Sequence, residues 1–581
     1  MNNATTSRGT PRRLLHCLVF TAVTTFGSAL LLPAQETPYD VVIAGGQIID
    51  GTGNLPVRAD VGIRGDKIAR VGFLEHAPAK LTIDAHGLTI VPGFIDMHSH
   101  ADDASGARSG LRSPDARRRA AASLIMQGIT TVVCNPDGSE PAISIREQRN
   151  QLRTLGIGPN AILLAGYNTI RGQVMGSDYK RPATPEEIQA MQARVKEALE
   201  EGAWGLSSGL EYVPAIWSTT DELVAVVQAL APYHAFYTEH ERSSGDAPMW
   251  WNPSQGPPDK PTVFDSMREL VEIGERTGVR VIATHLKSRG ELYWGGSRVL
   301  IDMVDRARAR GVDVWGDVYP YNTSGSDGEI VLIPRWAFGA GGESGSSSGS
   351  KDYAAALRRM MQDPRAAANV KRDIAHQLQL RGGAGRILIL DYPDRRDVGE
   401  YLAEFAKQKN LSPVDAVIAL QMEGYPNRLG GARVRSFSMS EIDVEALIAA
   451  PWVASSTDAG IALPEDGPNV HPRYYGSYPR KIRRYAMERK VVSVQDVIRA
   501  STSLPAQILR IEDRGLIREG YSADLAVLDL STIRDRSTPE KPHQYSDGVD
   551  YVLINGQMVV DHTKPTLALP GRVLDPARPT F

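Results

Sequence analysis

The sequence predicts an α/β fold, a (β/α)8 TIM-like barrel with a small β-sandwich module that is formed from both ends of the chain. Eight short apolar runs alternate with helical stretches between residues 93 and 502, which is the pattern of a parallel barrel. Glycine-punctuated β runs lie on either side, in 36–92 and 503–581. The 581 residues, 42% of them hydrophobic, exceed one compact domain and suit one large barrel with a smaller module.

Residues 1–35 have the order of a secretory signal peptide rather than that of a folded element. Arg12 and Arg13 precede an apolar run over 14–32, and we expect cleavage near Ala34. The mature chain is then exported to the periplasm or secreted. The apolar run is long for a signal peptide, so an uncleaved membrane anchor is the alternative. Contact with a membrane is expected only in that case.

The β module is predicted from short apolar strands that are separated by turns containing glycine. Its N-terminal part, 36–92, contains YDVVIAGGQIIDG, DVGIRGDKIARVG and LTIDAHGLTIVPG. Its C-terminal part, 503–581, contains ADLAVLDL and YVLINGQMVVDH. Because both parts show the same strand-and-turn pattern, we expect the chain ends to assemble into one module, with the barrel inserted between them.

The barrel, 93–502, needs eight strands separated by helices, and the sequence offers one apolar run for each strand. The clearest helix follows Thr184, which can cap it, with Pro185 in its first turn and Glu187 completing a capping box. The apolar side chains of this helix then recur at helical spacing. The predicted barrel strands are 93–98, 130–134, 161–166, 203–210, 235–240, 280–285, 313–321 and 452–458.

A further apolar run, 386–392, would make a ninth strand. We assign it to an insertion of about 336–430, which precedes the last barrel strand. The segment 338–351 in the same region is rich in glycine and serine, which is typical of a surface loop.

The net charge and the cysteine content argue against nucleic-acid or membrane partners and against stabilisation by disulfide bonds. A net charge of −3 gives no reason to expect a nucleic acid or an anionic membrane surface as a partner. Of the two cysteines, Cys17 lies in the expected signal peptide, so the mature chain keeps only Cys134 and forms no intramolecular disulfide. The core, and any bound metal, must then stabilise the fold. The number of subunits is left open, and a homo-oligomer is compatible with the sequence.

Histidines gather at the C-terminal ends of the predicted strands. His98 and His100 close the first strand, and the two-residue period of a strand points both side chains to one face. His240 and His285 end two further strands, and Asp458 ends the last one. In a barrel these ends share the mouth where active sites lie. A single histidine would more readily be a core or surface residue, but the whole set predicts a metal site.

The donor set indicates which metal and which chemistry to expect. Imidazole nitrogens with carboxylate oxygens suit Zn²⁺ and leave a coordination position for water. The metal lowers the pKa of that water towards about 7. A neighbouring carboxylate can take up a proton and later hand it to a leaving amine. Asp458 is the candidate for this acid/base role, and a helix N-cap is its structural alternative.

Several longer motifs extend the pattern beyond the strand ends. They are VPGFIDMHSHADD, GITTVV, GAWGLSSGLEYVP, FYTEHERSSGD, IATHLKS, DVYPYN, SSTDAG and HPRYYGSYPRKIRRY. Together they resemble the amidohydrolase superfamily, in particular its N-acyl-D-amino-acid deacylase (D-aminoacylase) branch, over nearly everything after the signal peptide. The resemblance implies a barrel with a flanking β module. It also implies a site with one or two Zn²⁺ ions, or other divalent metals, that hydrolyses the amide of an N-acylated D-amino acid.

The resemblance also assigns metal-binding roles to individual residues. His98 and His100 match the first-strand ligands of the more exposed metal position. His240 and His285 match the ligands of the tighter position. Asp458 matches the acid/base of the last strand, where it also contacts metal.

Three further residues match positions that are expected to hold the carboxylate of the substrate, namely Lys287, Tyr319 and Arg473. A cationic fork pairs well with a carboxylate, and a phenol can donate a hydrogen bond to a developing oxyanion, so Tyr319 is a catalytic candidate as well. Taken alone, Lys287 or Arg473 would more readily be a solvated charge or part of a structural ion pair. The expected partner is therefore a small molecule, an N-acylated D-amino acid or a short peptide.

One position departs from the family pattern. Many members place a metal-bridging cysteine shortly after TTVV, and the same count reaches Asp137 here, whereas Cys134 comes three residues early. Glu211 lies at the end of the fourth strand, where other amidohydrolases use a carboxylate or a carboxylated lysine. We rank Glu211 first as the bridge, then Asp137, then Cys134. A carboxylate in place of a thiolate is expected to harden the site and change its metal preference.

Two other functions are compatible with the sequence. A related amidohydrolase could cleave a dipeptide or a cyclic amide, since barrels support many chemistries, although the carboxylate-binding residues argue against a cyclic amide. A catalytically inactive barrel used as a binding module is the second alternative. Such a module would be expected to lose metal ligands, and all five strand-end residues are present.

Overall fold

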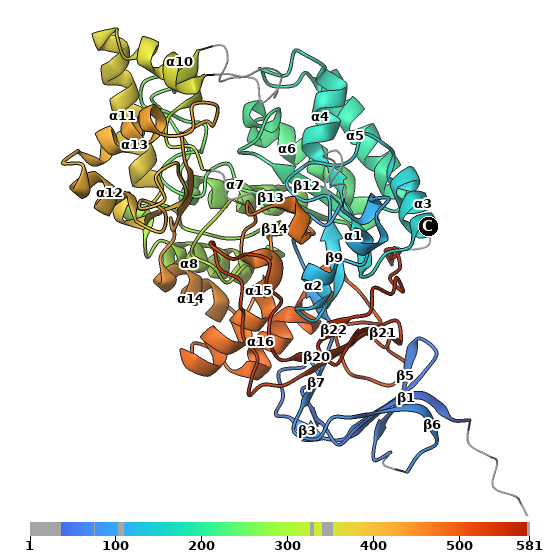
Figure 1. Ribbon diagram of the computed structural model, residues 1–581. Coiled ribbons are helices and arrows are strands. Elements are labelled where there is room, and N and C mark those ends of the chain that lie inside the picture. The colour runs from blue at the N-terminus through green and yellow to red at the C-terminus, as the bar shows by residue number, and fades with distance from the viewer. Residues whose placement is uncertain (1–36, 75, 103–109, 326–329, 340–351, 578–581) are drawn as a thin grey trace, which may run out of the picture. The chain divides into compact units, whose positions relative to one another are not determined.

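The computed structural model contains eight parallel strands that form a ring. Figure 1 labels β9, β12, β13 and β14 among them. Their hydrogen-bonded order follows the chain in two arcs, β8-β9-β10 and β11-β12-β13-β14-β15-β18. The strands are β8 (Phe94–Asp96), β9 (Ile129–Cys134), β10 (Asn160–Leu163) continued by β11 (Ala165–Gly166), β12 (Gly205–Gly209), β13 (Phe236–His240), β14 (Arg280–Ala283), β15 (Val314–Val318) and β18 (Val453–Ser455). The residues described are 37–74, 76–102, 110–325, 330–339 and 352–577.

Backbone hydrogen bonds join the two arcs into a closed barrel. At one junction Trp204 N, just before β12, donates to Leu163 O at the end of β10 at 2.9 Å. At the other, Met97 N after β8 donates to Ser455 O in β18 at 3.4 Å. Each of the eight predicted runs overlaps one strand of this ring, so the predicted barrel is confirmed.

Helices connect consecutive strands and cover the outside of the ring (Figure 1). α5 begins as predicted: the Thr184 hydroxyl accepts from Glu187 N, the Glu187 carboxylate accepts from Thr184 N, and Pro185 lies in the first turn. Met191 and Val195 on its inner face are buried in the main core. The principal covering helices are α3 (Ile145–Leu155), α5 (Pro185–Glu200), α6 (Thr220–Val227), α7 (Val263–Thr277), α8 (Ser297–Ala309), α14 (Glu441–Ala449) and α16 (Val494–Ser501).

The β module combines strands from both ends of the chain, as Figure 1 shows by the blue and red strands side by side. Its sheets have the orders β5-β4-β1-β6 and β22-β21-β20-β19-β7-β2-β3. Ile43 and Ile63 of the first sheet share a buried core with Ile90, Leu525 and others of the second. The strands are β1 (Tyr39–Ala44), β2 (Gln47–Ile48), β3 (Val57–Arg58), β4 (Asp60–Arg64), β5 (Lys67–Gly72), β6 (Ala79–Asp84), β7 (Thr89–Pro92), β19 (Leu525–Leu528), β20 (Val549–Ile554), β21 (Gln557–Asp561) and β22 (Lys564–Pro565).

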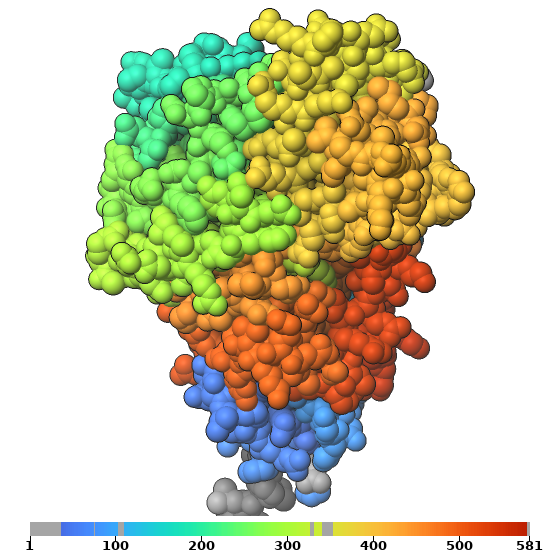
Figure 2. Space-filling model, turned by 90° about the vertical axis from the view of Figure 1, so that its left-hand side faces the viewer, coloured from blue at the N-terminus to red at the C-terminus, as the bar shows by residue number. Residues whose placement is uncertain are grey.

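The segment between β15 and α14 has a hydrophobic core of its own, with buried side chains from Ile330 to Val434. The predicted ninth strand is β16, and it pairs antiparallel with β17, outside the barrel. In Figure 2 the yellow and orange residues of this insertion gather together on the face shown. Its main elements are α10 (Tyr353–Met360), α11 (Pro364–Leu380), β16 (Ile387–Asp391), α12 (Leu402–Gln408), α13 (Pro413–Glu423) and β17 (Arg433–Ser436).

The described residues from Tyr39 onwards make up one compact unit. The predicted signal peptide, 1–35, lies outside the described residues. Among the helices that the structure describes, none has the length and apolar character needed to cross a membrane.

Candidate metal centre

The structure brings His98, His100, His240, His285 and Asp458, five of the predicted metal-binding residues, together at one mouth of the barrel. His98 and His100 follow β8, His240 ends β13, His285 follows β14, and Asp458 follows β18. His285 Nε2 lies 2.8 Å from His240 Nδ1, and His100 Nε2 lies 3.2 Å from Asp458 Oδ1. The parallel arrangement explains this meeting, because the C-terminal ends of all the strands face the same way.

Asp137 lies at the centre of these side chains. Its Oδ1 is 3.4 Å from His240 Nδ1 and His285 Nε2 and 3.5 Å from His98 Nε2. Its Oδ2 is 3.7 Å from His100 Nε2. Two ligand atoms that each lie about 2.1 Å from a tetrahedral zinc are separated by about 3.4 Å. The spacing around Asp137 therefore fits atoms that share a metal ion rather than a proton.

Unpaired buried atoms support the same conclusion. His98 Nε2 and Asp137 Oδ1 are buried without a hydrogen-bond partner in the described part of the chain. Such atoms are costly unless something compensates them. Two overlapping groups could each hold an ion, His98 with Asp137 and His285, and His98 with His100 and Asp458. Imidazole and carboxylate donors suit zinc, so the residues present fit this metal.

Glu211 does not occupy the bridging place that the sequence-based ranking gave it. Its Oε2 lies 3.2 Å from His240 Nε2, the ring nitrogen that faces away from Asp137. Its Oε1 accepts hydrogen bonds from Met249 N and from the Arg289 guanidinium. Glu211 is thus bound on the outer side of His240, and Asp137 takes the position between the histidines.

Cys134, the third bridge candidate, is fully buried at the end of β9 within the main hydrophobic core. The structure places its side chain among apolar neighbours, as expected for a small core residue.

Three of the gathered residues have backbone conformations that side chains other than glycine rarely adopt. The φ angles are +57° at Asp137, +37° at His285 and +52° at Asp458. Such conformations cost of order 1–3 kcal/mol each and concentrate at functional sites. The backbone at these three positions is therefore held in an unfavourable conformation that directs the side chains into the mouth of the barrel.

The electrostatics of the cluster favour bound cations. Burial alone would raise the pKa of Asp137, but His98 and His240 outweigh it and hold that pKa well below its usual range. Burial likewise opposes ionisation of Asp458, and Arg473 and then His100 outweigh it and lower its pKa. Against burial, Asp137 and Glu211 raise the pKa of His240 to about 10. The carboxylates stay ionised and attract positive charge to the centre.

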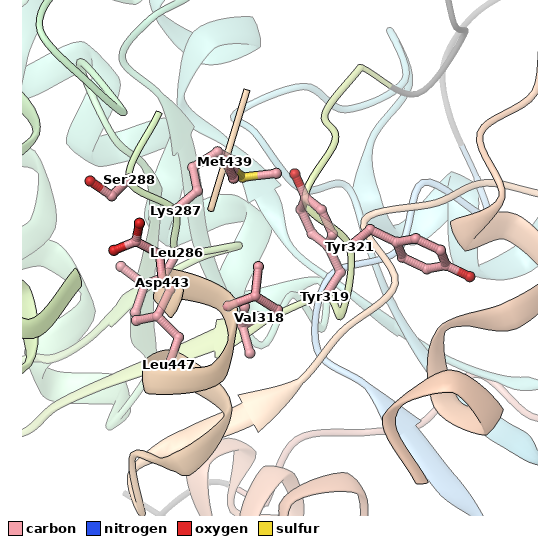
Figure 3. A pocket seen from close by; sticks show the side chains of 10 residues that line it. Leu286, Lys287, Ser288, Val318, Tyr319, Tyr321, Met439, Asp443 and Leu447 are labelled. Atoms are coloured by element: carbon pink, nitrogen blue, oxygen red, sulfur yellow. The ribbon is translucent and has the colours of Figure 1, made fainter. Parts of the chain in front are cut away.

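The predicted substrate-binding residues lie beside the metal cluster. Arg473 NH1 is 2.7 Å from Asp458 Oδ2, and its guanidinium carbon is 4.8 Å from the centre of the Tyr319 ring. Lys287 Nζ lies 5.9 Å from the same ring and 2.7 Å from His285 Nδ1. Tyr319 Oη is buried without a hydrogen-bond partner among the described residues. Figure 3 shows Lys287 and Tyr319 lining one pocket.

Comparison with known proteins identifies the family. The amidohydrolase family model matches residues 81–236 and 353–560. The chain belongs to this family. The N-acyl-D-glutamate deacylase of Alcaligenes xylosoxydans xylosoxydans is 31% identical, over 93% of this chain and 97% of its own. The D-aminoacylase of the same organism is 30% identical, over 93% of this chain and 98% of its own.

A solved structure carries the comparison to the metal. The N-acyl-D-glutamate deacylase of Bordetella bronchiseptica, complexed with zinc and a phosphonate mimic of the tetrahedral intermediate, is 28% identical with a TM-score of 0.70. The match covers 93% of this amidohydrolase and all of that chain. The barrel, its flanking β module and the D-aminoacylase branch are thereby confirmed.

Three residues near the centre of this amidohydrolase were not predicted from the sequence. The Tyr212 ring lies against that of His240, with centroids 4.4 Å apart and the ring planes tilted by 50°. Thr284 and Asp317 form a buried hydrogen-bonded chain to His98. All three belong to motifs already quoted, and Tyr212 and Thr284 are next to the candidate ligands Glu211 and His285, so position beside a candidate ligand was the available clue.

Proposed function

We propose that this chain hydrolyses the amide bond of N-acyl-D-amino acids and releases a carboxylate and a free D-amino acid. One observation carries the proposal: the Asp137 carboxylate lies among imidazole nitrogens at metal-ligand spacing, next to two buried cations, Lys287 and Arg473. The related deacylases act on N-acyl-D-glutamate and N-acyl-D-aspartate. Their full-length similarity supports the same reaction class here.

The metal would be held by imidazoles and carboxylates from five strand ends. Asp137 Oδ1 faces His98, His240 and His285, and Asp137 Oδ2 faces His100. Asp458 lies beside His98 and His100 and completes the group on that side. Asp137 is our proposed bridge, because its carboxylate faces the two first-strand histidines, His98 and His100, as well as His240 and His285. Bound zinc supplies an activated water near neutral pH and polarises the acyl carbonyl.

Asp458 is positioned to move the proton. Its Oδ1 faces His100 and its Oδ2 is paired with Arg473 at 2.7 Å, so the carboxylate is ionised and held in one orientation. It can accept a proton from the attacking water and donate it to the departing amine nitrogen as the C–N bond breaks.

Lys287, Tyr319 and Arg473 are proposed to bind the carboxylate of the substrate. Two cations that both lie close to the Tyr319 ring, together with the phenol hydroxyl, offer charge-assisted hydrogen bonds to one carboxylate. The unpaired Tyr319 hydroxyl then gains an acceptor. Binding this end of the substrate fixes its scissile amide relative to the metal centre, which promotes reaction by orientation.

A substrate panel tests the proposal. Purified protein, stripped with a chelator and reloaded with Zn²⁺, is given N-acetyl-D- and N-acetyl-L-amino acids, dipeptides with a C-terminal D-residue, and a hydantoin. We expect hydrolysis of the D-series only, lost on stripping and restored by zinc. Preferred turnover of L-substrates or of the cyclic amide would refute the assignment. A zinc-loaded protein inactive on the whole panel would indicate a binding module.

We further propose that the chain is exported, as Arg12, Arg13 and the apolar run 14–32 indicate. Mass spectrometry of the protein produced in a Gram-negative host should find a mature N-terminus close to Ala34 in the periplasmic or secreted fraction. An intact N-terminus in the membrane fraction would instead support the anchor.

A further inference from the structure

A chain of buried polar groups leads to His98 from behind the metal centre. His98 Nδ1 lies 2.5 Å from Thr284 Oγ1, and Thr284 Oγ1 donates to Asp317 Oδ2 at 2.8 Å. Thr284 and His98 are 1% exposed and Asp317 is 0% exposed, so water does not compete for these bonds. The three residues come from the ends of three different barrel strands.

The direction of each hydrogen bond follows from counting protons. Asp317 Oδ1 accepts the backbone N–H of His285 at 2.9 Å, and its Oδ2 accepts from Thr284. A threonine hydroxyl has one proton, which is used on Asp317, so towards His98 it can only accept. His98 Nδ1 must then carry the ring N–H. A neutral imidazole has a single N–H, which leaves His98 Nε2 with a free lone pair.

That free nitrogen is the one that faces the metal centre. His98 Nε2 lies 3.5 Å from Asp137 and 3.6 Å from Asp458, and no described group hydrogen-bonds to it. We propose that Asp317 and Thr284 are positioning residues that hold His98 in the tautomer whose Nε2 binds a metal ion. This inference rests on the metal centre of the proposed function, but not on its substrate.

Asp317 positions a second ligand as well. The N–H that it accepts belongs to His285, whose backbone has a φ of +37°. One carboxylate therefore fixes the ring orientation of His98 and the turn that presents His285. Removal of a residue that hydrogen-bonds to a metal ligand in this way typically lowers the metal affinity by about 10–100-fold.

Substitution of Thr284 gives the first test. Thr284→Val keeps the shape of the side chain but removes the acceptor for His98 Nδ1–H, whereas Thr284→Ser keeps the hydroxyl. We expect the Zn²⁺ dissociation constant, from chelator competition, to rise about 10–100-fold in Thr284→Val and to return close to wild type in Thr284→Ser. Thr502→Val is the matched control, because Thr502 donates a buried hydrogen bond to Ile498 O away from the centre.

Asp317→Asn tests the direction of the bonds. The His285 backbone N–H can only donate, so the amide oxygen must face it and the NH₂ group must face Thr284. The Thr284 proton then turns to His98 Nδ1 and forces the N–H onto Nε2. We expect zinc affinity to fall at least as far as in Thr284→Val, and the double variant to be no worse than Asp317→Asn alone. We call the hydrogen-bonded chain from Asp317 through Thr284 to His98 the relay. If the losses of zinc affinity in the two single variants added up in the double variant, the relay would be contradicted.

A direct measurement needs no variant of the relay. ¹⁵N NMR of metal-free protein labelled at histidine, with His98 assigned by its loss in His98→Gln, should show an Nδ1–H imidazole. Finding the Nε2–H tautomer, or wild-type zinc affinity in folded Thr284→Val, would overturn the inference. A protein that binds zinc with these dependences but hydrolyses no N-acyl-D-amino acid would refute the proposed function and leave the relay intact.

Discussion

Asp137 and Glu211 are both carboxylates close to His240, and their contacts predict different effects on the metal. Asp137 faces four imidazoles, so Asp137→Ala should weaken zinc binding by more than the roughly 10–100-fold typical of outer partners. Glu211 contacts only the outer nitrogen of His240, so Glu211→Gln should stay within that range. Metal analysis and chelator competition on the two purified variants measure the difference.

Asp137→Cys is the matched control for this comparison, because a thiolate can also bridge. It should retain metal and shift the preference towards softer ions such as Cd²⁺. Equal metal loss in Glu211→Gln and Asp137→Ala would return Glu211 to the bridging role.

Tyr319 allows binding of the substrate carboxylate to be separated from catalysis. Tyr319→Phe removes only the buried hydroxyl, which has no hydrogen-bond partner among the described residues, and keeps the ring beside Arg473 and Lys287. A hydrogen bond to a charged group is worth about 1.5–3 kcal/mol, so kcat/KM should fall by roughly 10–100-fold. If the hydroxyl binds the substrate carboxylate, the loss appears in KM and is absent with the corresponding amide-capped substrate. A loss confined to kcat would assign Tyr319 to the developing oxyanion.

At the residue scale the sequence predicted the strand-end residues that the structure brings together, and it ranked Asp137, the bridge that we propose, second. His98 and His100 were predictable because strand period fixes their side and barrel topology fixes their end. Asp137 follows a turn with a left-handed backbone, and no sequence period specifies where such a turn aims its side chain. Glu211 was ranked first from its strand end alone, and its partner Arg289 is distant in sequence.

At the scale of elements, the π-helix Lys481–Glu488 buries a lysine, and this makes stability depend on pH. Lys481 is 1% exposed, and burial lowers its pKa to about 7. Between about pH 7 and 10.5 the unfolded chain binds a proton that the folded chain lacks, so stability should rise with pH across that window. Below pH 7 the amine is charged in both the folded and the unfolded state, so the stability gained from the neutral amine at higher pH is absent.

Lys481→Met isolates the effect of that amine. Ser455 Oγ, which accepts from the amine, keeps its contact with Ser501, so the substitution leaves no orphaned hydroxyl. The variant should gain stability relative to wild type as pH falls from 10 to 7, by a few kcal/mol. Denaturant midpoints at several pH values measure this gap. A gap that does not change with pH would show that Lys481 titrates normally.

Elements with a strong local pattern were predictable, and those defined by tertiary partners were not. The capping box fixed the start of α5 from sequence alone. β16 was recognised as an apolar run, but its partner β17 was not, because the buried Arg433 and Arg435 give that strand no apolar signature. These arginines are buried since backbone carbonyls accept their N–H groups, which a sequence pattern does not reveal.

At the scale of the whole molecule, the two chain ends share one module, which the repeated β runs predicted. β7 pairs with β19 from Thr89↔Leu528 to Pro92↔Leu525. The sequence did not predict that the chain after β22 returns to the barrel. That return depends on backbone hydrogen bonds, which any residue type can make.

The returning segment should stabilise the barrel. Leu574 N donates to Ala161 O, and Ala161 N donates to Arg572 O, both at 2.9 Å, so the tail pairs with β10. Val573 is buried at 6% exposure, which is worth about 1.5–3 kcal/mol, with about 1 kcal/mol for each hydrogen bond. Truncation after Thr566 should therefore lower the free energy of unfolding by several kcal/mol.

Truncation after Asp575 is the matched control, because it keeps the segment that pairs with β10. Urea denaturation followed by tryptophan fluorescence should give a lower midpoint for the truncation after Thr566 and a wild-type midpoint for the control. Trp204 reports locally, since its indole N–H donates to Leu574 O at 3.2 Å and loses that acceptor only in the shorter chain. Identical midpoints and spectra for the two truncated chains would show that the segment after Thr566 does not stabilise the barrel.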